Sequence, residues 1–356
     1  MDSAEREGLR PKGNVPNLRF PEFQGEWKEY RIEDITENIS SGRCKSHSSS
    51  GKYNLYGSTG IIGKTNEACY EGNLVLVARV GANAGSLQIL NEPCGITDNT
   101  LIIKPKEVDV QYIYYFLQHF NLNRLIFGSG QPLITGGMLK KVKVSLGTIQ
   151  EQNKITRLLS ILDERIATQN KIIDKLQSLI KGIAQKIVRN NKPNVRLAEC
   201  LECESSTLQE SEVCEQGTYP VYGANGIVGY LDNYSTEGEA VYIIKDGSGV
   251  GTVSYVTGKC SATGTLNTLQ AKEGYSLQYL YYLLKVFNFE PYKTGMAIPH
   301  IYFKEYGKAK VFCPSYTEQL QYARLLSAID NKLSIEQNIL TELRLQKQYL
   351  LRQMFI

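Results

Sequence analysis

The chain has 356 residues, of which 42% are hydrophobic and 21% charged, a composition typical of a soluble globular protein of two domains. No apolar run approaches the roughly 20 residues needed to cross a bilayer, which argues against a membrane protein. Eight irregularly spaced cysteines with no signal peptide ahead of them indicate reduced thiols in a cytoplasmic protein, and a net charge of +4 does not by itself identify a nucleic-acid-binding protein.

The first half begins with a segment rich in glycine and tyrosine. Short β-branched runs at 74–80, 86–90 and 100–103 are bounded by Gly, Asn and Asp and predict strands joined by turns. The run QYIYYFLQHF at 111–120 favours a helix whose aromatic residues face a core. This segment therefore predicts a mixed α/β domain of about 120 residues or more.

A long helix follows the first α/β segment. From residue 155, apolar residues step alternately by four and three, which predicts one helix with a heptad seam. Gln169 is a polar position within this seam. The seam consists of Ile155, Leu159, Leu162, Ile166, Gln169, Ile173, Leu176, Ile180, Ile183 and Ile187.

The second half repeats the first at an interval of 166 or 167 residues. YNLYGSTGIIG at 53–63 returns as YPVYGANGIVG at 219–229, and RLLSILD at 157–163 returns as RLLSAID at 324–330. Each copy is large enough to hold its own core, so the pattern indicates the duplication of a whole domain rather than a solenoid.

The predicted elements repeat as well. Strands are predicted at 241–244 and 252–256, and a helix at 278–287. The second heptad seam consists of Tyr322, Leu326, Ile329, Leu333, Glu336, Leu340, Leu343, Lys347, Leu350 and Met354. The tyrosines of the two shorter helices favour core positions over base stacking: Tyr112, Tyr114, Tyr115, Tyr279, Tyr281 and Tyr282.

Pairing of the two long helices is the economical way to bury their apolar seams. The first helix leads from the first domain to the second, so the second helix must run back, and we expect an antiparallel pair. Gln169 and Glu336 fall at equivalent positions, where a polar pair costs stability but can fix the register. The expected fold is mixed α/β (α+β): two tandem, similar domains separated by two long antiparallel coiled-coil helices, with pseudo-two-fold symmetry.

Helix length adds a hint about function. A helix of about 38 residues is roughly 57 Å long. This is the scale on which two-fold proteins read DNA half-sites about 34 to 36 Å apart.

Four sequence features together resemble one known family, the specificity (S) subunits of type I restriction-modification systems. They are the N-terminal VPNLRFPEFQGEWKEYRIEDI at 15–35, the paired YGSTGIIG and YGANGIVG, the GSGQPLITGGMLKKVKV at 128–144, and the helix at 149–188. The second half departs from the pattern with KTGMAIPHIYFKEYGKAKVF at 293–312, as expected if the two halves read different sequences.

The resemblance implies a division of the chain into four segments. Residues 1–148 and 193–315 would be target-recognition domains, each reading one part of a bipartite double-stranded DNA target, and residues 149–190 and 316–356 the spacer helices. These helices would dock two methyltransferase (M) subunits, with restriction (R) subunits joining that complex. The chain itself would be a non-catalytic cytoplasmic subunit without a cofactor, and S-adenosylmethionine, ATP and magnesium would bind to the partner subunits.

The sequence offers little support for an enzyme. The Asn-Pro-Pro-Phe or Asp-Pro-Pro-Tyr motif of amino-methyltransferases and the Gly-x-x-x-x-Gly-Lys-Ser/Thr phosphate loop are absent. The glycines at 246–251 favour a turn over a cofactor loop. Cys200 and Cys203 form a CxxC without a second ligand pair, which favours plain thiols over a zinc site. The three histidines, His47, His119 and His300, lack repeated nucleophile or carboxylate partners.

Candidate DNA contacts follow from residue type. Arg and Lys suit guanine, Asn and Gln suit adenine, and Ser and Thr suit either, while Lys also binds phosphate. Such residues gather in loops, where solvated side chains are an equally good interpretation for any single position. In the first half they are Lys64, Arg79, Asn83, Thr97, Asp98, Asn99, Gln131, Thr135, Lys140, Lys141 and Lys143. In the second half they are Lys245, Ser248, Thr263, Thr265, Lys293, His300, Tyr302 and Lys304.

Two other functions remain open at this point. One is a duplicated adaptor that binds two protein partners without DNA, and the other is the specificity half of a restriction enzyme outside type I. A steep, linear loss of affinity with the logarithm of salt concentration would separate a DNA reader from an adaptor.

Overall fold

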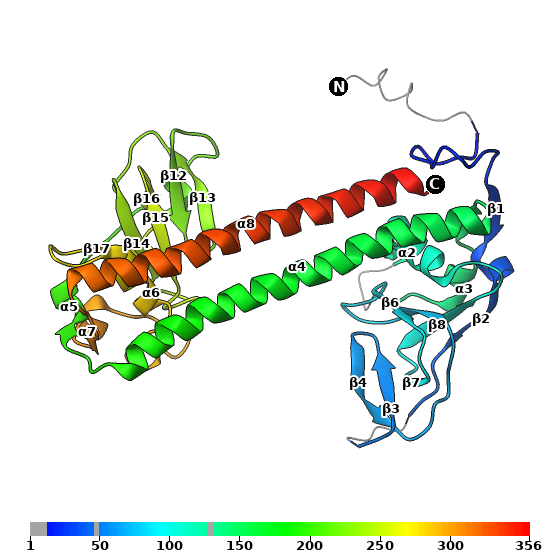
Figure 1. Ribbon diagram of the computed structural model, residues 1–356, viewed down its shortest axis with the longest axis horizontal. Helices are drawn as coiled ribbons and strands as arrows, with labels where there is room; N and C mark the ends of the chain where they lie inside the picture. The colour runs from blue at the N-terminus through cyan, green and yellow to red at the C-terminus, as the bar shows by residue number, and fades with distance from the viewer. Residues whose placement is uncertain (1–12, 46–49, 127–131) are drawn as a thin grey trace. The chain divides into compact units, whose positions relative to one another are not determined.

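The computed structural model describes residues 13–45, 50–126 and 132–356 (Figure 1). The chain forms two compact units, Met1–Thr168 with Ile339–Ile356, and Gln169–Asn338. Each unit contains one mixed α/β domain and one end of each long helix. The predicted mixed α/β class is therefore confirmed.

The described residues of the first unit form three small sheets. A four-stranded antiparallel sheet has the order β2-β8-β5-β6, a three-stranded sheet has the order β4-β3-β7, and β1 pairs with β9. The strands are β1 (Lys28–Arg31), β2 (Thr36–Ser41), β3 (Tyr53–Gly57), β4 (Gly60–Thr65), β5 (Leu74–Ala78), β6 (Leu87–Leu90), β7 (Cys94–Ile96), β8 (Thr100–Pro105) and β9 (Lys143–Leu146). The helices are η1 (Ile32–Ile35), α2 (Val110–Phe120), η2 (Leu122–Leu125), α3 (Gly136–Lys140) and the long α4 (Ile149–Asn190).

The second unit repeats this arrangement strand for strand. Its sheets have the orders β11-β17-β14-β15, β13-β12-β16 and β10-β18. The strands are β10 (Val195–Arg196), β11 (Leu201–Ser205), β12 (Tyr219–Gly223), β13 (Gly226–Leu231), β14 (Glu239–Ile244), β15 (Val253–Thr257), β16 (Ser261–Ala262), β17 (Leu266–Ala271) and β18 (Lys310–Val311). The helices are α5 (Leu197–Cys200), η3 (Glu210–Glu212), α6 (Leu277–Leu284), η4 (Glu290–Tyr292), α7 (Phe303–Tyr306) and the long α8 (Tyr316–Met354).

Two predicted elements end earlier than expected. The strand predicted to reach residue 80 ends at Ala78, where the chain turns into a glycine-rich loop. The helix predicted to reach residue 287 ends at Leu284, and Phe287 beyond it packs against Phe289 at a centroid distance of 4.7 Å. Five of the six tyrosines assigned to a core are buried, and Tyr114 is half-buried.

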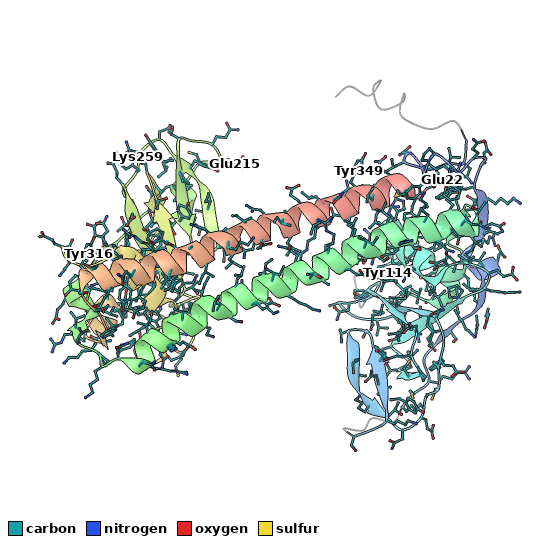
Figure 2. The ribbon with its side chains drawn as sticks, viewed as in Figure 1. Glu22, Tyr114, Glu215, Lys259, Tyr316 and Tyr349 are labelled. Atoms are coloured by element: carbon teal, nitrogen blue, oxygen red, sulfur yellow. The ribbon has the colours of Figure 1, made fainter. Side chains whose placement is uncertain are left out.

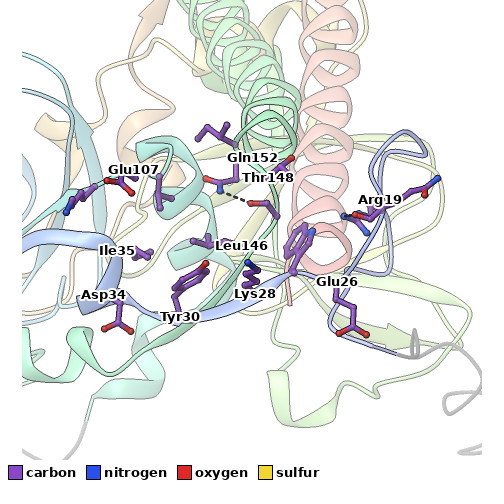
Figure 3. A pocket seen from close by; sticks show the side chains of 16 residues that line it. Arg19, Glu26, Lys28, Tyr30, Asp34, Ile35, Glu107, Leu146, Thr148 and Gln152 are labelled. Atoms are coloured by element: carbon purple, nitrogen blue, oxygen red, sulfur yellow. Dashed lines mark hydrogen bonds between the residues drawn. The ribbon is translucent and has the colours of Figure 1, made fainter.

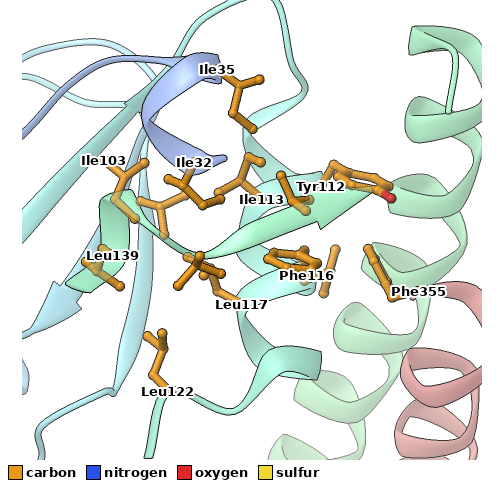
Figure 4. Packing of buried hydrophobic residues seen from close by; sticks show 14 of the residues in the cluster. Ile32, Ile35, Ile103, Tyr112, Ile113, Phe116, Leu117, Leu122, Leu139 and Phe355 are labelled. Carbon is orange, nitrogen blue, oxygen red and sulfur yellow. The ribbon is translucent and has the colours of Figure 1, made fainter. Parts of the chain in front are cut away.

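The core of the first unit joins the four-stranded sheet, α2 and the end of α8 (Figure 4). Asp109 caps α2 by accepting from Tyr112 N at 2.8 Å, which fixes the helix start. Phe116 belongs to the same buried cluster, and the ring centroid of Phe355, the residue that follows α8, lies 5.0 Å from that of Tyr112. Burying Phe355, which is 4% exposed, contributes about 1.5–3 kcal/mol. The last residues of the chain are therefore part of the first domain's core.

The long helices run antiparallel within the second unit. Gln169 of α4 donates to the backbone carbonyl of Glu336 at 2.9 Å and also to the Glu336 carboxylate. Ala184, later along α4, lines the same cavity as Asp330, earlier along α8. Lys332 and then Gln169 hold the pKa of the Glu336 carboxyl below its usual value. The polar pair is thus satisfied inside the seam, as a register-fixing contact requires.

Most of the seam is buried. Residues at most 8% exposed include Ile155, Leu159, Leu162, Gln169, Ile173, Ile180, Ile187, Leu326, Leu333, Glu336, Leu340, Leu343 and Met354. Ile166, Leu176, Ile183, Tyr322, Ile329, Lys347 and Leu350 are half-buried. Lys347 belongs to the first unit, where it donates to Asp163 of α4 at 2.6 Å.

Three equivalent hydrogen bonds recur in the two units. Two of them join the domain to a long helix, and the third joins a tyrosine to a backbone carbonyl shortly before that helix begins. In the first unit they are Tyr112 Oη to Ser145 O (2.9 Å), Tyr115 Oη to Asp163 Oδ2 (2.8 Å) and Asp109 N to Gln152 Oε1 (3.3 Å). In the second unit they are Tyr279 Oη to Phe312 O (2.8 Å), Tyr282 Oη to Asp330 Oδ2 (3.1 Å) and Ser276 N to Gln319 Oε1 (2.9 Å). Two of the three bonds therefore join each domain to one long helix, α4 in the first unit and α8 in the second.

A buried carboxylate anchors the start of α4 in the first unit. Glu151 at the start of α4 is fully buried and accepts from Arg19 Nε at 2.7 Å and from Trp27 Nε1 at 3.1 Å. Its equivalent, Glu318, is exposed and accepts from Ser315 instead. Removing one partner of a buried ion pair leaves a charge without compensation, which is strongly destabilising.

Glu151→Ala should therefore lower the free energy of unfolding of the first unit by about 3–5 kcal/mol. Denaturant unfolding followed by fluorescence suits this test, because Trp27 is the chain's single tryptophan and lies in this unit. The matched variant Glu318→Ala loses only an exposed helix-cap contact and should cost about 1 kcal/mol by circular dichroism. Equal, small losses for both variants would contradict the anchor.

No helix among the described residues has both the length and the apolar character that crossing a membrane requires.

Candidate nucleic-acid interface

Backbone hydrogen bonds bring three loops of the first domain together. Arg79 N donates to Asn99 O at 2.9 Å, Ile134 N donates to Arg79 O at 2.9 Å, and Gly81 N donates to Pro132 O at 3.1 Å. We call residues 79–83, 97–99 and 132–135 the first loop cluster. It lies at the end of the four-stranded sheet where β5 ends and β8 begins.

The second domain builds the same cluster with the same bonds. Lys245 N donates to Thr265 O at 3.0 Å, Ile301 N donates to Lys245 O at 2.9 Å, and Gly247 N donates to Pro299 O at 2.9 Å. We call residues 245–249, 263–265 and 299–302 the second loop cluster. Two domains with different sequences thus share one loop scaffold.

A β-hairpin is attached to each cluster. Thr97 N donates to Tyr56 O at 3.0 Å in the first domain, and Thr263 N donates to Tyr222 O at 2.9 Å in the second. The hairpins β3–β4 and β12–β13 therefore lie beside the loops (Figure 1). Each carries an exposed apolar pair after its turn: Ile61 and Ile62 in the first, Ile227 and Val228 in the second.

Most of the predicted contact residues lie in these clusters with accessible side chains. Asn83, Asp98, Asn99, Ser248 and Tyr302 are exposed, and Arg79, Thr97, Thr135, Lys245, Thr265 and His300 are half-buried. Gln131 and His47 lie outside the described residues. The clusters therefore offer hydrogen-bonding side chains of the types that read base edges.

Thr263 and Thr135 are already engaged in the fold. Thr263 is 1% exposed, and its hydroxyl bonds to that of Thr265 at 2.9 Å. Thr135 caps α3 by accepting from Met138 N at 3.3 Å. The buried position of Thr263 leaves Thr265 as the accessible hydroxyl of this pair.

Arg79 has an unusual environment at the first cluster. Its Nε is buried and finds no hydrogen-bond partner among the residues that the structure describes. Buried polar atoms almost always have a partner, so this guanidinium nitrogen is an exception within the described part of the chain. Arg79 is the cation among the described residues of the first loop cluster, and its side chain is half-buried.

Several predicted lysines lie outside the clusters or are paired. Lys140 is the last residue of α3 and Lys141 caps that helix. Lys143 pairs with Glu29 at 2.7 Å and Lys293 with Glu290 at 2.6 Å. Lys304 on α7 lies over the Tyr302 ring, 5.5 Å from its centroid.

Lys64 belongs to a polar network on the first hairpin. It donates to Asn54 Oδ1 at 2.9 Å, and Asn54 and Tyr56 both donate to Glu92 Oε1. Bonds from Asn54 and then Tyr56 lower the pKa of the Glu92 carboxyl. Burial, together with Glu92, raises the pKa of Tyr56 to about 12. Lys64 therefore has a structural partner on the hairpin.

The cysteines and histidines do not converge on a metal site within the described parts of the chain. Cys200 Sγ lies 3.9 Å from Cys313 Sγ rather than beside Cys203. Burial raises the pKa of the Cys203 thiol to about 11. The half-buried His119 stacks on Phe355 of the core at a centroid distance of 5.9 Å.

A cavity of about 440 Å³ lies where β1 meets the start of α4 (Figure 3). Charged residues of both signs surround it, including Lys28, Asp34 and Glu107. Gln152 lies at its wall and donates to Gly147 O at 3.0 Å, which holds the helix start in place. The lining thus joins the domain to α4 and contains no nucleophile paired with a base.

Comparisons with known proteins agree with this architecture. The pattern of the type I restriction modification DNA specificity domain matches residues 24–178 and again residues 191–345. A putative type I specificity subunit of Mycoplasma pneumoniae is 26% identical over 318 residues, which cover 80% of this chain and 83% of that protein. The MjaVIII type I restriction enzyme specificity subunit of Methanocaldococcus jannaschii is 27% identical over 236 residues, which cover 56% of this chain and 54% of that protein.

Two solved structures share the fold. The S subunit of a type I restriction-modification system from M. genitalium superposes with a TM-score of 0.72 at 20% identity, over 96% of this chain and 99% of that one. A chain from a study of complex assembly and conformational transition in the type I R-M system gives a TM-score of 0.52 at 13% identity, over 91% of this chain and 96% of that one. Because the specificity-domain pattern matches both halves of the sequence, the chain belongs to the type I restriction-modification DNA specificity family, with two tandem specificity domains.

Proposed function

We propose that each domain reads one part of a bipartite double-stranded DNA target through its loop cluster. The observation that carries this proposal is the repeated scaffold: two domains of a DNA-specificity family hold the same three loops with the same backbone bonds. The side chains that these loops expose are donors and acceptors that suit base edges and phosphates. Different side chains on one scaffold would let the two domains read different sequences.

The recognition domains in this proposal are residues 1–148 and 193–315, and the spacer helices are residues 149–190 and 316–356. Contact residues at the first cluster are Arg79, Asn83, Asp98 and Asn99, with Gln131 as a sequence-based candidate. Those at the second cluster are Lys245, Ser248, Thr265, His300 and Tyr302. Lysines with surface partners, such as Lys293, would serve phosphates after exchanging those partners.

The long helices are the proposed docking surface for two methyltransferase subunits, which restriction subunits would join. Apolar side chains remain exposed along both helices, a feature typical of surfaces that partners cover. They include Ile161, Ile172, Leu179, Leu325, Ile335, Ile339, Leu345 and Tyr349, the last of which is 58% exposed (Figure 2). The related structure from the study of complex assembly supports an assembled state for that protein.

Catalysis in this proposal belongs to the partner subunits, in the cytoplasm. The chain would bind no cofactor, and S-adenosylmethionine, ATP and magnesium would bind to its partners. The sequence supports this division, because it lacks both the methyltransferase motif and the phosphate loop.

The test is DNA binding by the chain assembled with its methyltransferase subunits. Methylation mapping first gives the bipartite motif, and duplexes with both halves intact, one half scrambled or both scrambled are then compared. We expect the intact duplex to bind at least about a thousand-fold more tightly than the fully scrambled one. The logarithm of the affinity should fall linearly with the logarithm of salt concentration. Equal affinity for all duplexes would contradict sequence reading.

A single variant locates the surface. Arg79→Ala should weaken binding by about 1–3 kcal/mol and relax the first half-site only. Lys104→Ala is the matched control, because Lys104 lies at the other end of β8 and pairs with Glu37 at 2.8 Å. Equal effects of the two variants would place the reading surface elsewhere.

A further inference from the structure

The two loop clusters differ most clearly at one pair of facing residues. Val80 faces Leu133 in an isolated antiparallel bridge of the first cluster, and Asp246 faces His300 in the equivalent bridge of the second. We propose that this bridge is a specificity-determining position: its side chains read one base pair in each half-site. The proposal rests on DNA reading by the clusters, as proposed above.

The backbone geometry of the two bridges is the same. Bonds from Ile134 N to Arg79 O and from Gly81 N to Pro132 O flank the first, and bonds from Ile301 N to Lys245 O and from Gly247 N to Pro299 O flank the second. In an antiparallel bridge of this kind the facing residues do not bond to each other, and their side chains lie close together on one face. Each bridge therefore presents two side chains as one surface element.

In the third loop, the buried residues are the same in both clusters and the accessible residues differ. The third loop reads Pro-Leu-Ile-Thr at 132–135 and Pro-His-Ile-Tyr at 299–302. Both isoleucines are buried, at 0% and 1% exposure, whereas Leu133 is 37% exposed and the His300 side chain is 35% exposed. The buried residues are identical and hold the loop, while the accessible residues have changed. That is the pattern expected of a fixed scaffold that carries variable contacts.

In the second cluster the bridge offers hydrogen-bond acceptors. His300 Nδ1 lies 2.5 Å from Asp246 Oδ1. A carboxylate can only accept, so Nδ1 carries the proton, and in the neutral imidazole this tautomer leaves Nε2 as an acceptor. The second carboxylate oxygen is also an acceptor. Acceptors in the major groove suit the exocyclic amines of cytosine and adenine.

In the first cluster the same position is apolar. Val80 and Leu133 have no hydrogen-bonding side-chain atoms, and both are accessible to solvent. An apolar contact in the major groove suits the methyl group of thymine. The bridge therefore reads an amine-bearing base in the second half-site and thymine in the first.

Exchanging the pairs tests this inference in the full chain assembled with its methyltransferase subunits. Asp246→Val with His300→Leu should change the preference at one base pair of the second half-site from cytosine or adenine toward thymine. The expected change in relative affinity is about ten-fold to a hundred-fold. Val80→Asp with Leu133→His should produce the opposite change in the first half-site. Methylation mapping and competition with duplexes substituted at single base pairs measure both.

The controls separate the failure of this inference from the failure of the proposed function. Glu202→Val also replaces an acid with an apolar residue in the second domain, but at an exposed position of the edge strand β11, and should leave both half-sites unchanged. If wild type reads a bipartite motif and both exchanged chains keep it unaltered, the bridge is not read. A change spread across a whole half-site, or in the wrong half-site, also overturns the inference. If the second-domain variant does not fold by circular dichroism, the first-domain exchange and the single variant His300→Leu decide.

Discussion

Replacing residues 193–315 with the corresponding segment of another type I specificity subunit should change the second half of the recognised sequence and leave the first half as it was. The physical reason is that each domain has its own core and its own bonds to the helices. The core of the first unit joins its sheet to α2 and α8, and a separate cluster around Tyr242 and Val256 lies in the second. Between described residues, no backbone hydrogen bond joins a loop of the first cluster to the exchanged segment.

The structure also specifies which specificity subunits can supply the exchanged segment. The incoming domain must present a tyrosine where Tyr282 bonds to Asp330, and a backbone amide where Ser276 bonds to Gln319. With these contacts kept, we expect a complete switch, in which the old second half-site loses about a thousand-fold or more in relative affinity. Methylation mapping of a strain that carries the hybrid gives the answer. A motif altered in both halves, or a folded hybrid that binds no sequence specifically, would exclude independent reading by two domains.

Periodic features of the sequence predicted the fold well. The duplication and the heptad steps predicted two mixed α/β domains and two long helices, because buried positions repeat at fixed intervals that can be counted. The polar pair Gln169 and Glu336 was predictable for the same reason, since each residue occupies a seam position of its helix.

Contact residues were harder to predict, because residue type does not reveal burial or partners. Thr263 has a suitable side chain but is buried, and Lys143 is paired with Glu29 across the β1–β9 sheet. Conversely, the Val80 side chain has no polar atom, so residue type did not identify it as a candidate contact, although its bridge to Leu133 lies within the cluster. Comparison of the two halves would have identified this position. The proline and the isoleucine are the same in Pro132-Leu133-Ile134 and Pro299-His300-Ile301, and the residue between them differs.

Lengthening both helices by four residues should move the two methylated half-sites apart by about one or two base pairs, with their sequences unchanged. Four residues add roughly 6 Å of helix at 1.5 Å per residue and nearly preserve the side-chain face. A base pair occupies about 3.4 Å along the duplex. The gap between half-sites therefore measures the length of the helix pair, provided that the pair sets the distance.

An insertion in α4 alone, for example near Ser178, would shift its side chains relative to those of α8. Both helices must therefore be lengthened, at the points where they pass from one unit to the other. The sites are between Thr168 and Gln169 and between Asn338 and Ile339. These positions keep the contact of Asp163 with Lys347 in the first unit and that of Gln169 with Glu336 in the second.

A matched control inserts the same four residues after Asn191, where α4 has ended and the added chain does not lengthen the paired helices. This control should methylate the wild-type motif with the wild-type gap. Methylation mapping compares three strains: wild type, the variant with both helices lengthened, and the control. If the helix pair sets the distance, the gap grows only in the lengthened variant, whereas a flexible connection would give the same gap in all three. If the doubly lengthened variant still methylates with the original spacing, the helix pair does not set the distance, and the loops at its ends must absorb the added length.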